Sequence, residues 1–140
     1  MRTRHFVLAP ALFAVALMVG CDGAALDSAL LPTTVENISA AELEALMESQ
    51  QRLVVLDVRS ASEYETGHIP GSVNVPLDEL AARHGELDPN VPVVCVCSSA
   101  FRSLQAAHLL VSEGFDRVMY LEGGLSNYCG PWDPDCPTCY

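Results

Sequence analysis

Hydrophobic residues in this chain form two kinds of pattern, short continuous runs and stretches with helical spacing. Four segments have the length and β-branched content of strands: 52–58, 73–75, 91–97 and 117–121. Continuous apolar runs of this length are typical of strands buried on both faces. Three segments have the spacing of amphipathic helices: 38–49, 77–85 and 102–114. This alternation predicts an α/β fold, a small, mostly parallel sheet flanked by helices on both faces.

The first twenty residues are predicted to be a signal peptide. Two arginines precede fourteen uncharged, mostly apolar residues from Phe6 to Val19. At about 1.5 Å per residue this stretch is shorter than a hydrocarbon core of about 30 Å. The following "MVGC" resembles the lipobox of bacterial lipoproteins, with Met18 where leucine is more usual, and Cys21 as the lipidated residue. Ordinary secretion with cleavage near Ala24 or Ala25 is the alternative.

These patterns divide the chain into four parts: a signal peptide (1–20), a lipid-anchored tether (21–35), a folded domain (36–128) and a Cys/Pro-rich tail (129–140). The expected location is the cell envelope, with the protein anchored through its N-terminal lipid on the periplasmic or extracytoplasmic side of a bacterial membrane. No nucleic-acid partner is expected, because removal of 1–20 leaves five arginines, no lysine and eighteen acidic residues, a formal charge of −13. The absence of lysine also excludes Schiff-base chemistry.

Two cysteines lie at the end of the apolar run 91–97. Ligands of open parallel sheets bind beyond the carboxyl ends of strands, where Cys97 lies and Cys95 does not. The helix that follows offers unpaired N–H groups and the positive end of its dipole, and Arg102 adds a positive charge. These features favour the nucleophilic thiolate form of Cys97. Cys95 is predicted to be a small buried hydrophobe.

Three segments, "LDVRSASEYETGHIPGSVNVP", "VVCVCSSAFRSLQAAHLL" and "GFDRVMYLEGGLSNY", together resemble a single-domain rhodanese, a sulfurtransferase. The resemblance implies that Cys97 accepts sulfur from thiosulfate or a similar small anionic donor and passes it to a thiol or cyanide. It implies that Arg102 closes the loop and attracts the donor, while main-chain N–H groups cradle the sulfur. The implied binding-loop residues are Ser98, Ser99, Ala100, Phe101 and Ser103. No cofactor or metal is implied.

The loop has two further features. Four residues separate Cys97 from Arg102, whereas the related cell-cycle phosphatases have five, and by family analogy the shorter ring suits a sulfur atom rather than a phosphate. Ala100 stands where the family commonly has glycine. Because alanine at positive φ costs about 1 kcal/mol more than glycine, the loop either avoids that conformation or is strained. Weakened activity is therefore one expectation.

The remaining polar candidates have structural interpretations. By the resemblance, Asp57, Arg59 and His68 support the loop from behind. Glu63 and Glu65 are interpreted as surface residues or local pairing partners. The tail cysteines Cys129, Cys136 and Cys139 are predicted to form a structural disulfide with one spare thiol. Two alternative functions stay open: a non-catalytic binding module with this fold, and a thiol redox protein that uses the tail.

Overall fold

The computed structural model describes residues 34–49 and 51–128. The predicted signal peptide, the predicted lipidation site Cys21 and the tail cysteines Cys129, Cys136 and Cys139 lie outside these residues. Within the described ranges no helix is both long and apolar enough to cross a bilayer. The elements, in chain order, are β1 (Glu36–Ile38), α1 (Ala40–Glu48), β2 (Val54–Asp57), α2 (Ala61–Glu65), β3 (Val73–Asn74), α3 (Leu77–Arg83), the 3-10 helix η2 (His84–Glu86), β4 (Val93–Val96), α4 (Phe101–Ser112), β5 (Val118–Leu121) and the 3-10 helix η3 (Leu125–Asn127).

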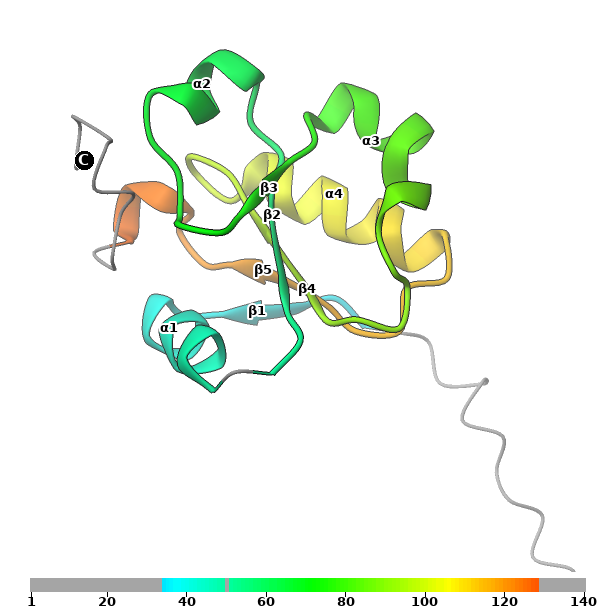
Figure 1. Ribbon diagram of the computed structural model, residues 1–140, viewed down its shortest axis with the longest axis horizontal. Helices are drawn as coiled ribbons and strands as arrows, with labels where there is room; N and C mark the ends of the chain where they lie inside the picture. The colour runs from blue at the N-terminus through cyan, green and yellow to red at the C-terminus, as the bar shows by residue number, and fades with distance from the viewer. Residues whose placement is uncertain (1–33, 50, 129–140) are drawn as a thin grey trace, which may run out of the picture. The chain divides into compact units, whose positions relative to one another are not determined.

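The five strands form one sheet in the order β1-β5-β4-β2-β3, and every neighbouring pair is parallel. The predicted fold class is confirmed, and the sheet is wholly parallel within the described residues. Figure 1 shows α3 and α4 on one side of the sheet and α1 on the other. Because the strands run in one direction, the residues that follow β2, β4 and β5 meet at the same end of the sheet.

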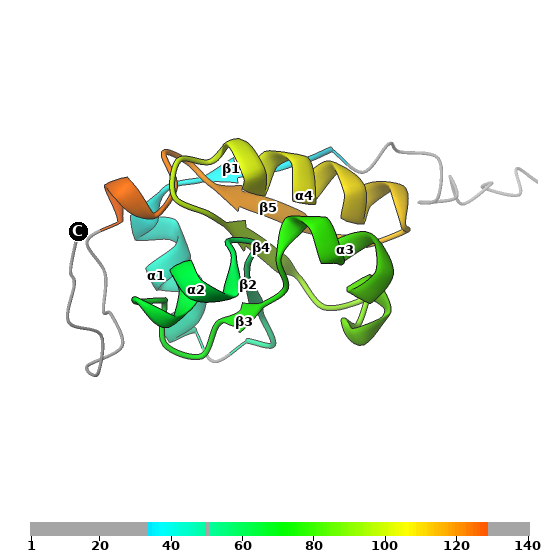
Figure 2. The same ribbon diagram turned by 90° about the horizontal axis from the view of Figure 1, so that it is seen from above.

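Alternate residues of the central strands point to opposite faces, and this alternation builds two cores. Val93, Cys95 and Cys97 belong to the core under α3 and α4, together with Leu80 and Leu110 of those helices. The neighbours Val94 and Val96 belong to the other core, with Leu43 of α1 and Leu125 of η3. In Figure 2 helix α4 runs alongside β4 and β5, which it contacts. The position of Cys97 is therefore set by packing on both sides of β4.

Two short elements were not predicted from the sequence. Strand β1 lies at the start of the domain, where its three residues give too short a pattern to recognise, and it forms only by pairing with β5. Helix α2 lies in a segment that Gly67, Pro70 and Gly71 mark as irregular, and it contains no buried residue. Its start is a capping box between Ser60 and Glu63, an S-x-x-E signal of helix initiation.

A buried ion pair fixes the end of β2. The Arg59 guanidinium donates two hydrogen bonds to one Asp57 oxygen, from Nε at 3.0 Å and Nη2 at 2.7 Å, with side chains 6% and 0% exposed. Arg59 Nη2 also donates to the carbonyl oxygen of Gly67 at 2.5 Å. The amide of Asn74 donates to the carbonyl oxygens of Asp57 and Arg59, both at 2.9 Å. This network ties the segment after α2 to the end of the sheet.

The substitution Arg59→Met tests how much this network contributes to the stability of the fold. The substitution leaves the Asp57 carboxylate buried without its cation, and we expect the free energy of unfolding to fall by about 3 kcal/mol in a urea titration. The matched control is Arg83→Met, which removes ion pairs to Glu79 and Glu86 at the surface. A much smaller loss is expected there, because solvent screens exposed pairs. Equal losses in the two variants would contradict a structural role for Arg59.

Candidate functional site

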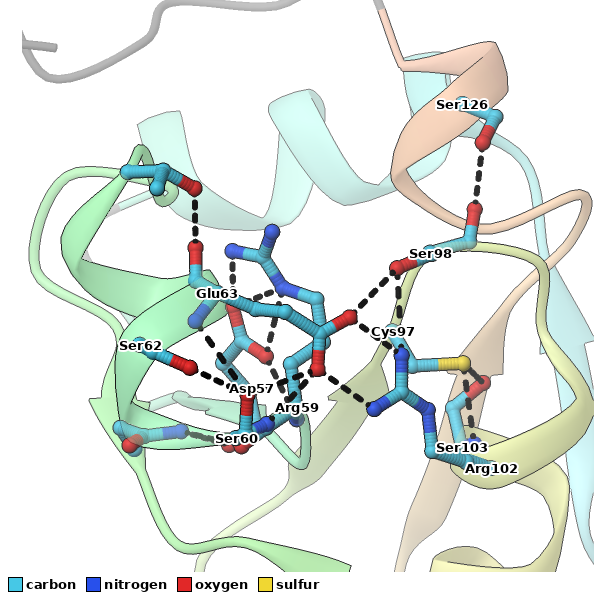
Figure 3. A network of polar contacts seen from close by, with 12 residues as sticks. Asp57, Arg59, Ser60, Ser62, Glu63, Cys97, Ser98, Arg102, Ser103 and Ser126 are labelled. Atoms are coloured by element: carbon cyan, nitrogen blue, oxygen red, sulfur yellow. Dashed lines mark hydrogen bonds and ion pairs between the residues drawn. The ribbon is translucent and has the colours of Figure 1, made fainter.

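Cys97 is the first residue after β4 and begins the loop that leads into α4. Its side chain is buried, with 1% of the residue exposed. The N–H of Ser103, in the first turn of α4, donates to Cys97 Sγ at 3.3 Å, and the Ser103 hydroxyl oxygen lies 3.5 Å from the same sulfur (Figure 3). In the described part of the chain, one main-chain N–H, that of Ser103, donates to this sulfur. The sequence predicts a ring of several main-chain N–H groups around it. The sulfur thus lies under the start of α4 and deeper than an open loop would place it.

The loop carbonyls point away from the sulfur because a distant segment binds them. The N–H of Leu125 donates to the carbonyl oxygen of Cys97 at 2.8 Å, and the N–H of Ser126 donates to that of Ser98 at 3.0 Å. The Ser126 hydroxyl donates to the same Ser98 oxygen at 2.7 Å. These bonds hold the carbonyl dipoles outward, which removes two partial negative charges from the side where a thiolate would form.

Gly124 permits this close approach. A Cβ at this position would lie 2.5 Å from the carbonyl oxygen of Cys97, 2.6 Å from that of Ser98 and 2.7 Å from the nitrogen of Ala100. Backbone atoms cannot move aside as a flexible side chain can. Gly124 and Ser126 were not singled out from the sequence, because they are linked to the loop only through the fold.

Ala100 adopts a left-handed conformation with φ 73° and ψ −15°. Of the two options that the sequence left open, the strained one is therefore observed. Its carbonyl oxygen accepts from the Ser103 hydroxyl at 2.9 Å and from the N–H of Leu104 at 3.0 Å. These hydrogen bonds hold the turn despite the unfavourable backbone of an alanine.

Glu63 is a site residue that sequence reasoning missed. Its carboxylate accepts from both terminal nitrogens of Arg102, each at 2.7 Å. Ser98 joins the group, since its hydroxyl donates to Glu63 at 3.3 Å and lies 3.2 Å from an Arg102 nitrogen. The two charged side chains are 38% and 35% exposed. The Arg102 charge that was expected to attract a donor is therefore already matched by a carboxylate.

The same carboxylate also caps α2. Glu63 accepts from the N–H of Ser60 at 3.0 Å and from the Ser60 hydroxyl at 2.9 Å. The Arg102 guanidinium, followed by Ser60, holds the pKa of Glu63 well below its usual range. The S-x-x-E spacing at 60–63 could have marked Glu63 as a helix cap, but its pairing with Arg102 joins residues 39 positions apart.

The remaining loop residues take different positions. Phe101 begins α4 and is 70% exposed, and Ser99 is also exposed. Cys95 is fully buried, and burial, followed by the neighbouring Cys97 thiol, raises the pKa of the Cys95 thiol. It therefore remains protonated and unreactive, which leaves Cys97 as the nucleophile candidate among the described cysteines.

His68 lies in the segment after α2. Its ring stacks on Tyr64 with centroids 3.8 Å apart, and its Nδ1 is 3.0 Å from the Tyr64 carbonyl oxygen. His68 therefore packs against the last turn of α2, and its role in supporting the loop stays a prediction.

A shallow depression of about 350 Å³ opens beside Arg102. Its lining residues are Val58, Ser60, Pro76, Leu77, Asp78 and Arg102. Three of these side chains are apolar: Val58 follows β2, Pro76 precedes α3 and Leu77 is the first residue of α3. Between residues 34 and 128, leaving out 50, no group of three or more His, Cys, Asp or Glu side chains is placed to bind a metal ion.

Ala100→Gly should stabilise the protein. Glycine adopts φ near +73° without the Cβ penalty, so we expect the free energy of unfolding to rise by about 0.5 to 1 kcal/mol in a urea titration. Ala81→Gly, at an exposed position within α3, is the control and should lower it by about 1 kcal/mol. A loss of stability in both variants would show that Ala100 is not strained.

Gly124→Ala should disrupt the loop. Its Cβ would overlap backbone atoms, so we expect a loss of about 2 kcal/mol beyond that of Gly71→Ala, together with slower alkylation of Cys97 by iodoacetamide. Gly71 is a matched control, because it also has positive φ, 78° against 65°, but a Cβ added there would have no atom within 4 Å. Equal effects of the two substitutions would argue against tight contact at Gly124.

Comparison with known proteins places this geometry in a family. Residues 39–130 match the family described as the rhodanese-like domain. The chain is 32% identical over 94 residues to the thiosulfate sulfurtransferase GlpE of Shewanella oneidensis, covering 67% of this chain and 92% of that protein. It is 35% identical over 98 residues to Bacillus subtilis YrkF, covering 70% of this chain. The matched region of this chain spans about half of the length of YrkF, 53%.

Solved structures give the same result. A rhodanese-related protein of Thermoplasma volcanium matches with a TM-score of 0.64 at 28% identity, over 70% of this chain and 97% of that one. The rhodanese-like domain of the Anabaena protein Alr3790 matches with a TM-score of 0.68 at 28% identity, over 76% and 85%. With a parallel sheet of this order and a cysteine loop at the end of its central strand, the chain belongs to the rhodanese-like domain family.

Proposed function

We propose that this protein is a sulfurtransferase that takes sulfane sulfur from thiosulfate or a similar donor and passes it, through a persulfide on Cys97, to a thiol or cyanide. The observation that carries the proposal is the environment of Cys97 Sγ. The sulfur accepts the Ser103 N–H, while the carbonyls of Cys97 and Ser98 are bonded away from it. Such a site favours negative charge on Cys97 Sγ, the form of the residue that attacks the donor.

The proposed chemistry is a pair of displacements. The Cys97 thiolate attacks the outer sulfur of the donor, so that an S–S bond to Cys97 forms and the donor's own bond to that sulfur breaks. With thiosulfate, sulfite leaves with the bonding electron pair. The acceptor then attacks the outer sulfur of the persulfide, and Cys97 leaves as a thiolate. Cyanide gives thiocyanate, and no external oxidant or reductant is needed.

Two observations favour sulfur over a phosphoryl group. Only four residues separate Cys97 from Arg102, and Cys97 is 1% exposed. A buried sulfur in a short loop can accept a single additional atom more easily than a tetrahedral group with three outer oxygens. The relatives described as thiosulfate sulfurtransferases support the same choice.

The test uses intact-mass spectrometry. Thiosulfate should add about 32 mass units, one sulfur atom, to the wild type, and Cys97→Ser should abolish both the adduct and thiocyanate formation. Cys95→Ala is the matched control, since it removes the buried neighbouring thiol, and it should retain both. Wild-type behaviour of Cys97→Ser would exclude this mechanism.

The other two functions predict different results. A non-catalytic binding module would form no adduct in the wild type and would show no selective labelling of Cys97. A redox protein would change the disulfide pattern of Cys129, Cys136 and Cys139 on peroxide treatment. The lipid anchor at Cys21 and the cell-envelope location remain predictions from the sequence.

A further inference from the structure

We propose that Glu63 is a specificity-determining residue that disfavours doubly charged sulfur donors such as thiosulfate. The preferred donors are then organic persulfides, whose persulfide group carries at most one negative charge. This inference rests on the proposed sulfur transfer and names the donor class of the same site. Three observations carry it: the pairing of Arg102, the charge of the surrounding domain and the depression beside the loop.

The first observation is that Arg102 is already bound. Glu63 accepts from both of its terminal nitrogens at 2.7 Å, the bidentate geometry with which a guanidinium would otherwise hold an oxyanion (Figure 3). A sulfonate group that used Arg102 would have to displace this carboxylate and leave it near a second anion. Glu63 also caps α2 through Ser60, which holds it in place. Arg102 is therefore a weak anchor for thiosulfate.

The second observation is that the domain as a whole and the surroundings of the loop are negatively charged. The described residues contain fourteen carboxylates and five arginines, a formal charge of −9. The other arginine near the site, Arg59, is neutralised by Asp57. The exposed Asp78 adds a carboxylate to the lining of the depression. Since the Coulomb energy scales with the product of charges, a dianion is repelled about twice as strongly as a monoanion.

The third observation concerns shape and polarity. The depression beside Arg102 has apolar walls from Val58, Pro76 and Leu77 and a volume of about 350 Å³. The carbon skeleton of an organic persulfide would bury apolar surface there, whereas thiosulfate has no carbon to bury. The depression thus adds affinity for the donor class that the charges favour.

Sulfur transfer from an organic persulfide to Cys97 needs no external oxidant or reductant. The Cys97 thiolate attacks the outer sulfur of the persulfide, a new S–S bond forms, and the donor's S–S bond breaks. The organic thiolate leaves with the electron pair, and a proton from the outer sulfur or from water converts it to the thiol. The oxidation state of the moved sulfur is unchanged.

The experiment measures single-turnover loading of Cys97 in the full chain by intact mass, with thiosulfate and with cysteine persulfide as donors. Glu63→Gln retains an oxygen that can accept from Ser60 and Arg102 but removes the charge. We expect thiosulfate loading to accelerate about tenfold and persulfide loading to change less than about threefold. The control Glu65→Gln, at an exposed position of the same helix, should change neither rate more than about twofold. An unchanged ratio of the two rates in Glu63→Gln would overturn the proposal.

A second measurement covers the case in which Glu63→Gln does not fold. In the wild type, raising the salt concentration screens repulsion, so thiosulfate loading should accelerate more than persulfide loading. Slower thiosulfate loading at high salt would mean that the site attracts dianions, and the proposal would be wrong. A failure of the proposed sulfurtransferase function would give a different result. Neither donor would add sulfur to the wild-type protein, or Cys97→Ser would gain sulfur as the wild type does.

Discussion

The pairing of the segment 124–126 with the cysteine loop is the constraint on which the site depends. Two main-chain N–H groups, those of Leu125 and Ser126, bind the carbonyls of Cys97 and Ser98. A peptide whose carbonyl is turned one way presents its N–H the other way, so these bonds set the polarity of the loop interior. Gly124 lets the two backbones approach closely enough for the bonds to form. The surroundings of Cys97 are thus made by a segment that begins more than twenty residues later.

Two ion pairs at the same end of the sheet have different consequences because their burial differs. The pair of Asp57 and Arg59 is buried, so its hydrogen bonds anchor the backbone after β2 and it is removed from solvent. The pair of Glu63 and Arg102 is more than a third exposed, so an incoming anion meets it directly. The first pair supports the fold around the loop. The second leaves little unpaired positive charge at the solvent-facing side of the loop.

The strain at Ala100 is consistent with a loop held by its surroundings rather than by its own preference. Its carbonyl is bound by the Ser103 hydroxyl and the N–H of Leu104, and Gly124 packs against its nitrogen. A cost of about 1 kcal/mol is small beside several such contacts. Backbone strain of this kind is found where surrounding structure fixes a functional geometry.

The sequence by itself determined most of the strand and helix pattern, a mostly parallel sheet, and the positions of Cys95 inside a strand and Cys97 at its exit, because these follow from periodicity over a few residues. It did not reveal β1, which exists only through pairing with β5. Only the tertiary structure decided that Glu63 neutralises Arg102, 39 residues away, and that Ser126 binds Ser98, 28 residues away. Such contacts depend on how the strands are ordered in the sheet, and no local pattern of residues records that order.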